Sequence, residues 1–258
     1  MSAPAPSDAG VQLGFERLRL DVRRVIDLIL ALAVLAMLLP VMACITLAIW
    51  LEDGRPIFFG QTRLGRQARC FRLLKFRKFR AQSTGGPNLT LDSDARMTRV
   101  GALLEKTKLD ELPQLWNIVR GDMAIVGPRP ESLPFADCLR GPNRALLDYR
   151  PGLFGPCQTI FRHERAYYRD VSDLDDFYRR ILFPLKAGID LAYYPSRTLR
   201  SDLAWAARSV LAVLGRSPLP QQATGDLKHV EEWIRNYAQR SAPGGHTDER
   251  PLASLGRG

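Results

Sequence analysis

LDELPQLWN occupies residues 109–117, GDM follows at 121–123, and VGPRP follows at 126–130. In this stretch two adjacent carboxylates, Asp110 and Glu111, stand among apolar and structure-fixing residues, about one short helix ahead of the glycine–proline–arginine–proline turn. Carboxylates are costly to bury unless they are paired or bind a metal, so the pair indicates a cation. An aspartate can also attack phosphorus as a nucleophile. The alternative is an acidic pair at a helix N-terminus, where the macrodipole favours it.

The same block resembles the signature of the bacterial sugar transferases called monotopic phosphoglycosyl transferases, and the resemblance extends from about Arg23 to Leu203. In that family the aspartate of the Asp-Glu pair attacks a nucleotide-activated sugar, and the product is a lipid-linked sugar. The resemblance implies that Asp110 is the nucleophile and Glu111 the metal-associated partner. We expect Mg²⁺ at Asp110 and Glu111, because an oxygen-preferring divalent ion bridges carboxylates and phosphate oxygens. Neighbours on a helix point about 100° apart, so one carboxylate attacks while the other holds the ion.

Composition and charge restrict the classes of partner. A chain of 258 residues allows one large domain or two small ones, and its formal charge of +10 with a pI near 9.8 favours anionic partners. The four cysteines form no Cys-x-x-Cys pair, and the three histidines are widely scattered. This pattern argues against a structural zinc ion, a disulfide framework and a histidine-based site.

A long apolar segment lies near the N-terminus, with no charged residue in the 24 positions from Leu28 to Leu51. As a straight helix it measures about 36 Å, enough to cross the core of a bilayer. However, basic residues flank both ends, and the positive-inside bias cannot hold on both sides of a membrane. Pro40 removes a backbone donor and kinks a helix. We therefore expect a re-entrant hairpin that bends at Leu39-Pro40, as in the family that the chain resembles. A kinked spanning helix and a buried soluble helix are the alternatives.

The predicted fold class is α+β and mainly helical. It combines a re-entrant membrane helix hairpin, interfacial amphipathic helices and a small β element around an active site on the cytoplasmic face. We divide the chain into a disordered N-terminus (1–16), an amphipathic segment with the re-entrant helix (17–52), a catalytic domain (53–215) and a C-terminal extension with one short helix (216–258). Arg23, Arg24 and Asp27 match the Arg-Arg-x-x-Asp pattern with which the family begins its membrane segment. A local ion pair is the alternative explanation for these three residues.

Local patterns predict the remaining elements. Apolar and basic residues roughly alternate over 70–76, which indicates a strand, and 57–59 is a short strand-like run. Residues 81–95 have the composition of a mobile loop, and 149–155 that of a turn followed by a strand. Helices are expected over 98–107, 109–119, 173–182, 202–215 and 226–239.

Several basic side chains are candidate phosphate ligands, because guanidinium groups bind diphosphate oxygens in a planar, bidentate way. Arg129 is fixed in direction by Pro128 and Pro130, and the family's Pro-Arg-Pro motif is associated with the nucleotide. The alternative is an arginine that caps a helix end. Four further residues match family motifs, and a solvated charge or a structural role is the alternative for each: Lys75, Arg77, Arg150 and Asp190.

Three positions depart from the family pattern. Glu105 stands where arginine is usual, Lys78 where threonine or serine is common, and Cys157 where alanine usually precedes the glutamine. We expect these departures to alter substrate contacts without removing activity.

The resemblance implies transfer of a sugar 1-phosphate from a UDP-sugar to polyprenyl (undecaprenyl) phosphate, with release of UMP and a phosphosugar ester of Asp110 as intermediate. This reaction initiates the assembly of bacterial exopolysaccharide, capsule, O-antigen or glycoconjugates. The expected partners are the UDP-sugar, polyprenyl phosphate and membrane lipid, with no nucleic acid and with a homodimer left open. The expected location is the cytoplasmic face of the bacterial inner membrane. A membrane-tethered basic binding or regulatory protein and a metal-dependent membrane phosphodiesterase are the alternative functions.

Overall fold

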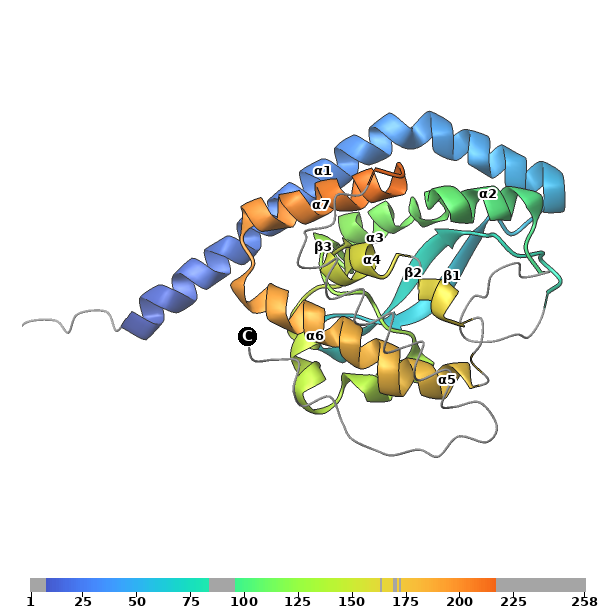
Figure 1. Cartoon of the computed structure of the whole chain (residues 1–258). Helices are drawn as coiled ribbons and strands as arrows, with labels where there is room; N and C mark the ends of the chain where they lie inside the picture. The colour runs from blue at the N-terminus through green and yellow to red at the C-terminus, as the bar shows by residue number, and fades with distance from the viewer. Residues whose placement is uncertain (1–7, 84–95, 163, 169–170, 172, 217–258) are drawn as a thin grey trace, which may run out of the picture.

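The structure, a computed structural model, describes residues 8–83, 96–162, 164–168, 171 and 173–216 (Figure 1). These residues form mainly helices with two small sheets, which confirms the predicted α+β, mainly helical class. The α-helices are α1 (Asp8–Asp53), α2 (Arg99–Thr107), α3 (Gln114–Arg120), α4 (Pro156–Ile160), α5 (Leu174–Phe177), α6 (Phe183–Tyr193) and α7 (Leu199–Val213). The strands are β1 (Phe58–Leu64), β2 (Cys70–Phe76), β3 (Ala124–Val126) and β4 (Gly152–Phe154). Shorter helical segments are η1 (Arg66–Ala68), η2 (Leu109–Glu111), η3 (Leu133–Leu139), η4 (Gly141–Asp148), η5 (Glu164–Tyr168), η6 (Tyr178–Leu182) and η7 (Tyr194–Ser196).

The apolar segment belongs to α1, a single helix that contains Pro40. Its part from Val22 to Asp53 is long and apolar enough to cross a membrane, by length and composition. Figure 1 shows α1 bent, with the rest of the molecule on the inner side of the bend. The helix continues through Leu39 and Pro40, because a proline removes only one backbone donor and the adjoining turns keep theirs. The re-entrant course of this helix stays a prediction.

Strands β1 and β2 form an antiparallel hairpin whose register runs from Phe58 opposite Phe76 to Leu64 opposite Cys70. The strand predicted over 70–76 is thereby confirmed with those bounds. Leu73 and Phe76 are buried side chains of β2 that pack in clusters with residues of α1. The hairpin is thus fastened to the membrane helix through its apolar side chains.

The helix expected over 109–119 is wrong in its continuity. Lys108 adopts a left-handed conformation (φ 60°) that ends α2, and the 3₁₀ turn η2 carries Asp110 and Glu111. Pro113 then precedes the first residue of α3. A proline lacks the backbone N–H of a helix interior and suits a helix start, which explains why α3 begins after it.

The glycine–proline–arginine–proline turn lies against the Arg-Pro-Gly turn through parallel strands β3 and β4, which pair Ala124 with Gly152. A Cβ atom on Gly127 would lie 2.1 Å from the carbonyl oxygen of Arg150, and one on Gly152 would lie 2.0 Å from the nitrogen of Gly127. Both positions need glycine because two backbone segments touch there. This contact sets the place of the residues that follow Gly127.

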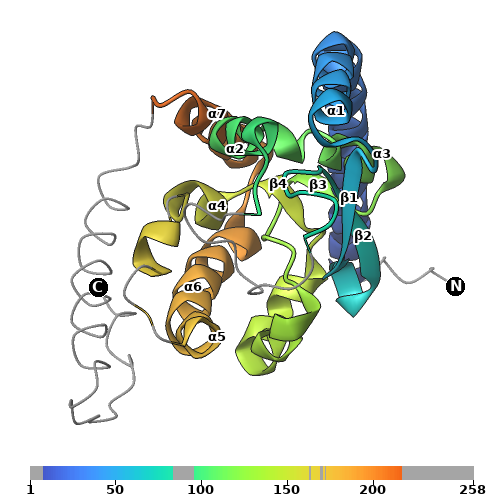
Figure 2. The same cartoon turned by 90° about the vertical axis from the view of Figure 1, so that its right-hand side faces the viewer.

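The largest buried cluster lies in the C-terminal half, where aromatic and aliphatic side chains of η3, η6 and α6 pack together. Helices α1, α2, α3 and α7 lie along one side of the molecule in both views (Figures 1 and 2). The helices predicted over 98–107, 173–182 and 202–215 are found close to those bounds, as α2, as α5 with η6, and as α7. The expected helix over 226–239, most of the loop over 81–95 and most of the C-terminal extension lie outside the described residues.

Candidate active site

Asp110 is a buried carboxylate at the start of the motif, with 3% of its surface exposed. The Nζ atom of Lys75, on β2, lies 4.0 Å from Oδ2 of Asp110 and donates a 2.7 Å hydrogen bond to Oε1 of Glu111. The other oxygen of Asp110, Oδ1, is buried and has no hydrogen-bond partner among the described residues. A buried acceptor without a partner is costly, so this oxygen is suited to receive a cation or to react.

The two carboxylates have opposite electrostatic environments. Burial raises the pKa of Asp110, and the charge of Glu111 adds to the rise, while Lys75 opposes it. Burial also disfavours the charge of Glu111, but Lys75, Arg129 and Lys108 outweigh it and lower the pKa of Glu111 to about 2. Glu111 therefore carries a fixed negative charge, and Asp110 is the carboxyl whose protonation responds to its surroundings.

Glu111 and Arg129 together line two adjoining cavities. The smaller, of about 20 Å³, also has Arg63 and Lys75 in its wall. The larger, of about 120 Å³, is lined by both residues and by four more charged side chains, namely Lys108, Arg162, Glu164 and Lys186. Four cations against two carboxylates make the larger cavity a place for an anion next to the Asp-Glu pair.

The backbone around Arg129 is held from two sides. Arg63 of β1 donates a 3.2 Å hydrogen bond to the carbonyl oxygen of Pro130, and Gly152 donates one of 2.9 Å to that of Pro128. Although dehydration opposes its charge, the nearby carboxylates of Glu164 and Glu111 raise the pKa of Arg129. Arg129 is therefore close to the carboxylates of Glu111 and Glu164, and it lines both cavities beside Glu111.

Arg77 is not brought to this cluster. It is 7% exposed, its Nη1 donates a 2.5 Å hydrogen bond to Oδ2 of Asp53, and its Nη2 donates to the carbonyl oxygens of Asp53 and Gly54. These contacts fasten the end of β2 to the end of α1. The phosphate-ligand role of Arg77 therefore has no support from its contacts.

Asp190 and Arg150 also lie apart from Asp110. Asp190 is 3% exposed, its Oδ1 accepts a 3.4 Å hydrogen bond from the backbone of Cys157, and burial raises its pKa to about 8. It lines a small cavity that borders Pro128, Arg129 and Pro130. Arg150 lines a different cavity, beside α1 and α7.

Two of the departures from the family pattern contact each other. Lys78 Nζ donates a 2.9 Å hydrogen bond to Oε1 of Glu105, and both side chains are largely buried. The charge of Lys78 also lowers the pKa of Asp110. The two residues that depart from the family pattern therefore form one ion pair, and this pair acts electrostatically on the candidate nucleophile.

Five charged residues around the cavities were missed in the sequence analysis, namely Arg63, Lys108, Arg162, Glu164 and Lys186. Lys186 Nζ lies 2.8 Å from Oε2 of Glu164, and this pair is formed by segments 22 residues apart. For Lys108, its place next to the motif was the one available signal. No local pattern marks the other four, because only the tertiary fold brings them together.

The residues present fit a magnesium ion only in combination with a substrate. Among the described residues no group of three or more His, Cys, Asp or Glu side chains is placed to hold a metal. Mg²⁺ in phosphoryl-transfer sites is commonly bound by one or two carboxylates together with substrate phosphates and water. Asp110, with its partnerless Oδ1, and Glu111 supply such a partial set.

Comparison with known proteins agrees with this geometry. The family model for bacterial sugar transferases matches residues 18–216, and the chain belongs to this family. The UDP-N-acetylgalactosamine-undecaprenyl-phosphate N-acetylgalactosaminephosphotransferase of Aeromonas hydrophila is 33% identical over 190 residues, which cover 69% of this chain and 43% of that protein.

Two proteins named UDP-glucose:undecaprenyl-phosphate glucose-1-phosphate transferase are also similar. The one from Caulobacter vibrioides is 40% identical over 149 residues, covering 55% of each chain. The one from Escherichia coli is 38% identical over 168 residues, covering 64% of this chain and 35% of that protein. This chain therefore spans roughly a third to just over half of the length of these three relatives.

Proposed function

We propose that this protein transfers a sugar 1-phosphate from a UDP-sugar to polyprenyl phosphate and releases UMP. The observation that carries the proposal is a buried aspartate, Asp110, with a partnerless carboxylate oxygen beside Glu111, Lys75 and a cationic cavity. Membership of the family and the names of the similar proteins support the substrate class. A buried carboxylate inside a strongly basic region is difficult to explain for a protein that only binds anions.

In the proposed mechanism an Asp110 carboxylate oxygen attacks the phosphorus that carries the sugar. The bond from that phosphorus to UMP breaks, UMP leaves, and a phosphosugar ester of Asp110 remains. An oxygen of polyprenyl phosphate then attacks the same phosphorus, which forms the lipid diphosphate sugar and frees the carboxylate. Neither displacement needs a net proton, so positioning and charge neutralisation are the main tasks of the site.

The side chains around Asp110 have distinct tasks in this mechanism. Lys75 lowers the pKa of both Asp110 and Glu111 and so favours their ionised forms. Arg129 supplies a planar cation for diphosphate oxygens. A magnesium ion held by Asp110 and Glu111 supplies further neutralisation of phosphate charge when it is bound. Lys108 and Arg162 add positive charge to the cavity that we assign to the donor.

For the membrane arrangement we propose that α1 is re-entrant and that residues 53–215 form the catalytic domain on the cytoplasmic face of the inner membrane. Exposed apolar side chains on α2, α3 and α7 support this, since these helices lie on the α1 side of the molecule (Figure 2). Three examples, each at least half exposed, are Leu103, Trp116 and Leu203. Interfacial helices place such residues at the level of the lipid head groups. A homodimer and a role in polysaccharide or glycoconjugate assembly stay predictions.

The decisive experiment measures UMP release by the full chain in detergent or nanodiscs across a panel of UDP-sugars, with and without undecaprenyl phosphate. The proposal expects continuous turnover with the lipid and about one UMP per active site without it. Continuous hydrolysis without lipid would instead identify a phosphodiesterase. Release of no UMP from any donor would favour the membrane-tethered binding protein.

A further inference from the structure

A second cavity, of about 360 Å³, lies between the N-terminal half of α1, the segment around Arg150 and the start of α7. None of its lining residues lines either cavity next to Glu111. Its charged lining consists of four arginines and three aspartates, namely Arg23, Arg66, Arg150, Arg197, Asp27, Asp148 and Asp202. The proposed reaction at Asp110 uses none of them, so this cavity needs its own explanation.

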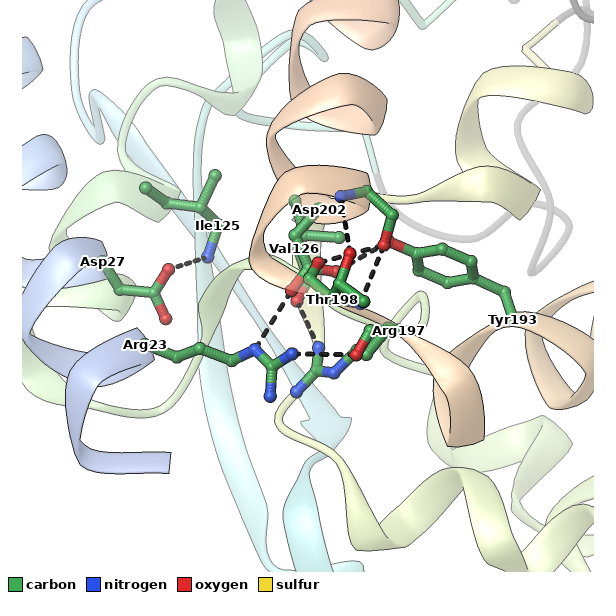
Figure 3. Close-up of polar contacts among 9 residues, drawn as sticks. Arg23, Asp27, Ile125, Val126, Tyr193, Arg197, Thr198 and Asp202 are labelled. Atoms are coloured by element: carbon green, nitrogen blue, oxygen red, sulfur yellow. Dashed lines mark hydrogen bonds and ion pairs between the residues drawn. The ribbon is translucent and has the colours of Figure 1, made fainter. Parts of the chain in front are cut away.

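Part of this charge holds the walls of the cavity together (Figure 3). Arg23 Nε lies 3.2 Å from Oδ2 of Asp202, whose other oxygen accepts a 2.7 Å hydrogen bond from the hydroxyl of Tyr193. Asp27 accepts a hydrogen bond of 3.1 Å from the backbone of Ile125. The local ion pair that was the alternative explanation for Arg23 and Asp27 is not what these contacts show: Arg23 and Asp27 make long-range contacts that join α1 to α7 and β3.

Arg197 is fixed in the same way. It donates a 3.1 Å hydrogen bond to the carbonyl oxygen of Val126, and its guanidinium carbon lies 5.3 Å and 5.5 Å from the ring centroids of Tyr149 and Tyr194. The backbone carbonyl of Arg197 in turn accepts a 3.0 Å hydrogen bond from Arg23. These contacts make a rigid frame with a cationic lining.

Arg66 provides the cavity with a hydrogen-bond donor that a ligand could use. Its Nε is buried and has no hydrogen-bond partner among the described residues, although the residue lines the cavity. A buried guanidinium N–H without a partner is costly unless something binds it. Arg150 adds a second cationic side chain to the same lining. Two guanidinium groups at one cavity suit the oxygens of a phosphate.

Part of the lining is apolar and comes from α1 and α7. α1 contributes Ile26 and Leu30, and α7 contributes Leu199, Leu203 and Ala206. Leu30, Leu199 and Leu203 are 38%, 39% and 55% exposed. A soluble phosphate has no use for such a wall, whereas the glycerol backbone and first acyl carbons of a phospholipid do.

We propose that this cavity binds the phosphate of an anionic membrane phospholipid, with Arg66 and Arg150 on the phosphate and the leucines of α1 and α7 against the acyl part. The site is separate from the one that handles the reacting polyprenyl phosphate. The bound lipid fastens the junction of α1 and α7, where Arg23 and Asp202 already meet. This inference does not depend on the reaction proposed at Asp110.

The test measures lipid binding to the full-length protein in detergent by native mass spectrometry. Phosphatidylglycerol, phosphatidylcholine, inorganic phosphate and undecaprenyl phosphate are compared in separate arms. Phosphatidylglycerol is expected to bind about tenfold more tightly than phosphatidylcholine and to resist millimolar inorganic phosphate. Arg66→Gln and Arg150→Gln are each expected to weaken it about tenfold, as expected for loss of one charge-assisted contact of about 1.5 kcal/mol.

Arg69→Gln is the matched control, because Arg69 is an exposed arginine of the same hairpin connection and does not line the cavity. Leu203→Gln alters the apolar wall at an exposed position and is expected to weaken the lipid while leaving the melting temperature unchanged. If the wild type, Arg66→Gln and Arg150→Gln bound phosphatidylglycerol equally well, the lipid would not bind in this cavity. Displacement by inorganic phosphate, or binding of undecaprenyl phosphate alone, would overturn the assignment to a phospholipid.

Discussion

Asp110 and Glu111 are adjacent in the chain, yet their surroundings separate them into two chemical roles. Glu111 accepts a hydrogen bond from Lys75 and stays ionised, while Asp110 keeps one oxygen without a partner in a buried place. A nucleophile benefits from such an oxygen, since no donor has to be displaced before it attacks. The ionised neighbour is better suited to a fixed electrostatic task.

Replacing Asp110 with asparagine tests the nucleophile directly. Asp110→Asn keeps the shape of the side chain but removes the anion, so we expect transfer to fall by at least about 10³-fold. In the absence of lipid, radiolabelled sugar phosphate should attach to the wild-type protein and not to the variant. Asp137→Asn, at a surface aspartate, is the control that should keep both activities. Near-normal transfer by Asp110→Asn, or a label on another residue, would refute this mechanism.

The pH dependence of the first half-reaction tests the electrostatics of the pair. A protonated Asp110 cannot attack, so UMP release should decline as the pH falls through its raised pKa, at a higher pH than for an ordinary aspartate. Lys75→Gln removes a charge that lowers this pKa, so the acid limb should move to higher pH. Glu111→Gln removes a charge that raises it, so the limb should move to lower pH, whatever the loss in amplitude. Single-turnover profiles give the midpoints. The control Lys106→Gln, at an exposed lysine of α2, should leave the midpoint of the acid limb unchanged. If Lys75→Gln and Glu111→Gln shifted this midpoint in the same direction, the acid limb would not report the protonation of Asp110.

Lys78 and Glu105, which both depart from the family pattern, form an ion pair with each other. This pair explains why the two departures occur together. Removing either partner takes a 2.9 Å ion-pair contact from the other, largely buried charge, which is destabilising. A double-mutant cycle with Lys78→Thr and Glu105→Ala should give a coupling free energy of about 1–3 kcal/mol in thermal or denaturant unfolding. The exposed pair Arg180–Asp176 serves as control and should give about 0.5 kcal/mol or less. A coupling of that small size for Lys78 and Glu105 would show that the two departures are independent.

At the scale of elements, Asn117 connects α3 to β2. It is fully buried, its Nδ2 donates a 2.8 Å hydrogen bond to the carbonyl oxygen of Arg72, and its Oδ1 accepts one of 3.0 Å from the backbone of Leu74. Asn117→Ala leaves both backbone groups without partners, so the free energy of unfolding should fall by about 2–4 kcal/mol. Thermal unfolding in detergent measures this, with Asn143→Ala, at a partly exposed asparagine, as control. If Asn117→Ala and Asn143→Ala both lowered the free energy of unfolding by the same small amount, Asn117 would not be the connection between α3 and β2.

Elements whose cause is local could be predicted from the sequence. The strand over 70–76 follows from alternation, and α2 from an apolar pattern behind Thr98, whose side chain accepts a hydrogen bond from the backbone of Gly101. The interruption of the helix over 109–119 was missed, although Pro113 was a local signal for it. The partners of Arg77 and Asp190 were not predictable, because contacts with Asp53 and Cys157 depend on how distant segments pack. Family motifs therefore singled out Asp110, Glu111 and Arg129 as candidates, but they gave no sign of the buried contacts that Arg77 and Asp190 make.

At the scale of the whole molecule, helices α1, α2, α3 and α7 lie on one side (Figure 1), and each of them carries exposed apolar side chains. Asp110 and Glu111 lie on η2, which connects α2 to α3. In the proposed membrane arrangement, this place lets a lipid phosphate in the head-group region and a soluble nucleotide sugar reach the same carboxylate. The proposal fits the net charge of +10, which favours anionic partners.

The last prediction concerns the side of the membrane on which the two ends of the chain lie. If α1 is re-entrant, single cysteines at Ser7 and Ser217 should be labelled from the same, cytoplasmic side. A background without Cys44, Cys70 and Cys138, which are at least partly exposed, is needed for this measurement.

Pro40→Leu restores the missing backbone donor and should straighten α1, so part of the population should then expose residue 7 to the periplasm. Leu39→Ala, next to the proline, is the matched control and should keep both labels on the cytoplasmic side. Labelling of residue 7 from the periplasm in the unaltered background would mean that the helix spans the membrane. In that case the presence of basic residues at both ends of the apolar segment would need a different explanation, because one end would then lie outside the cytoplasm.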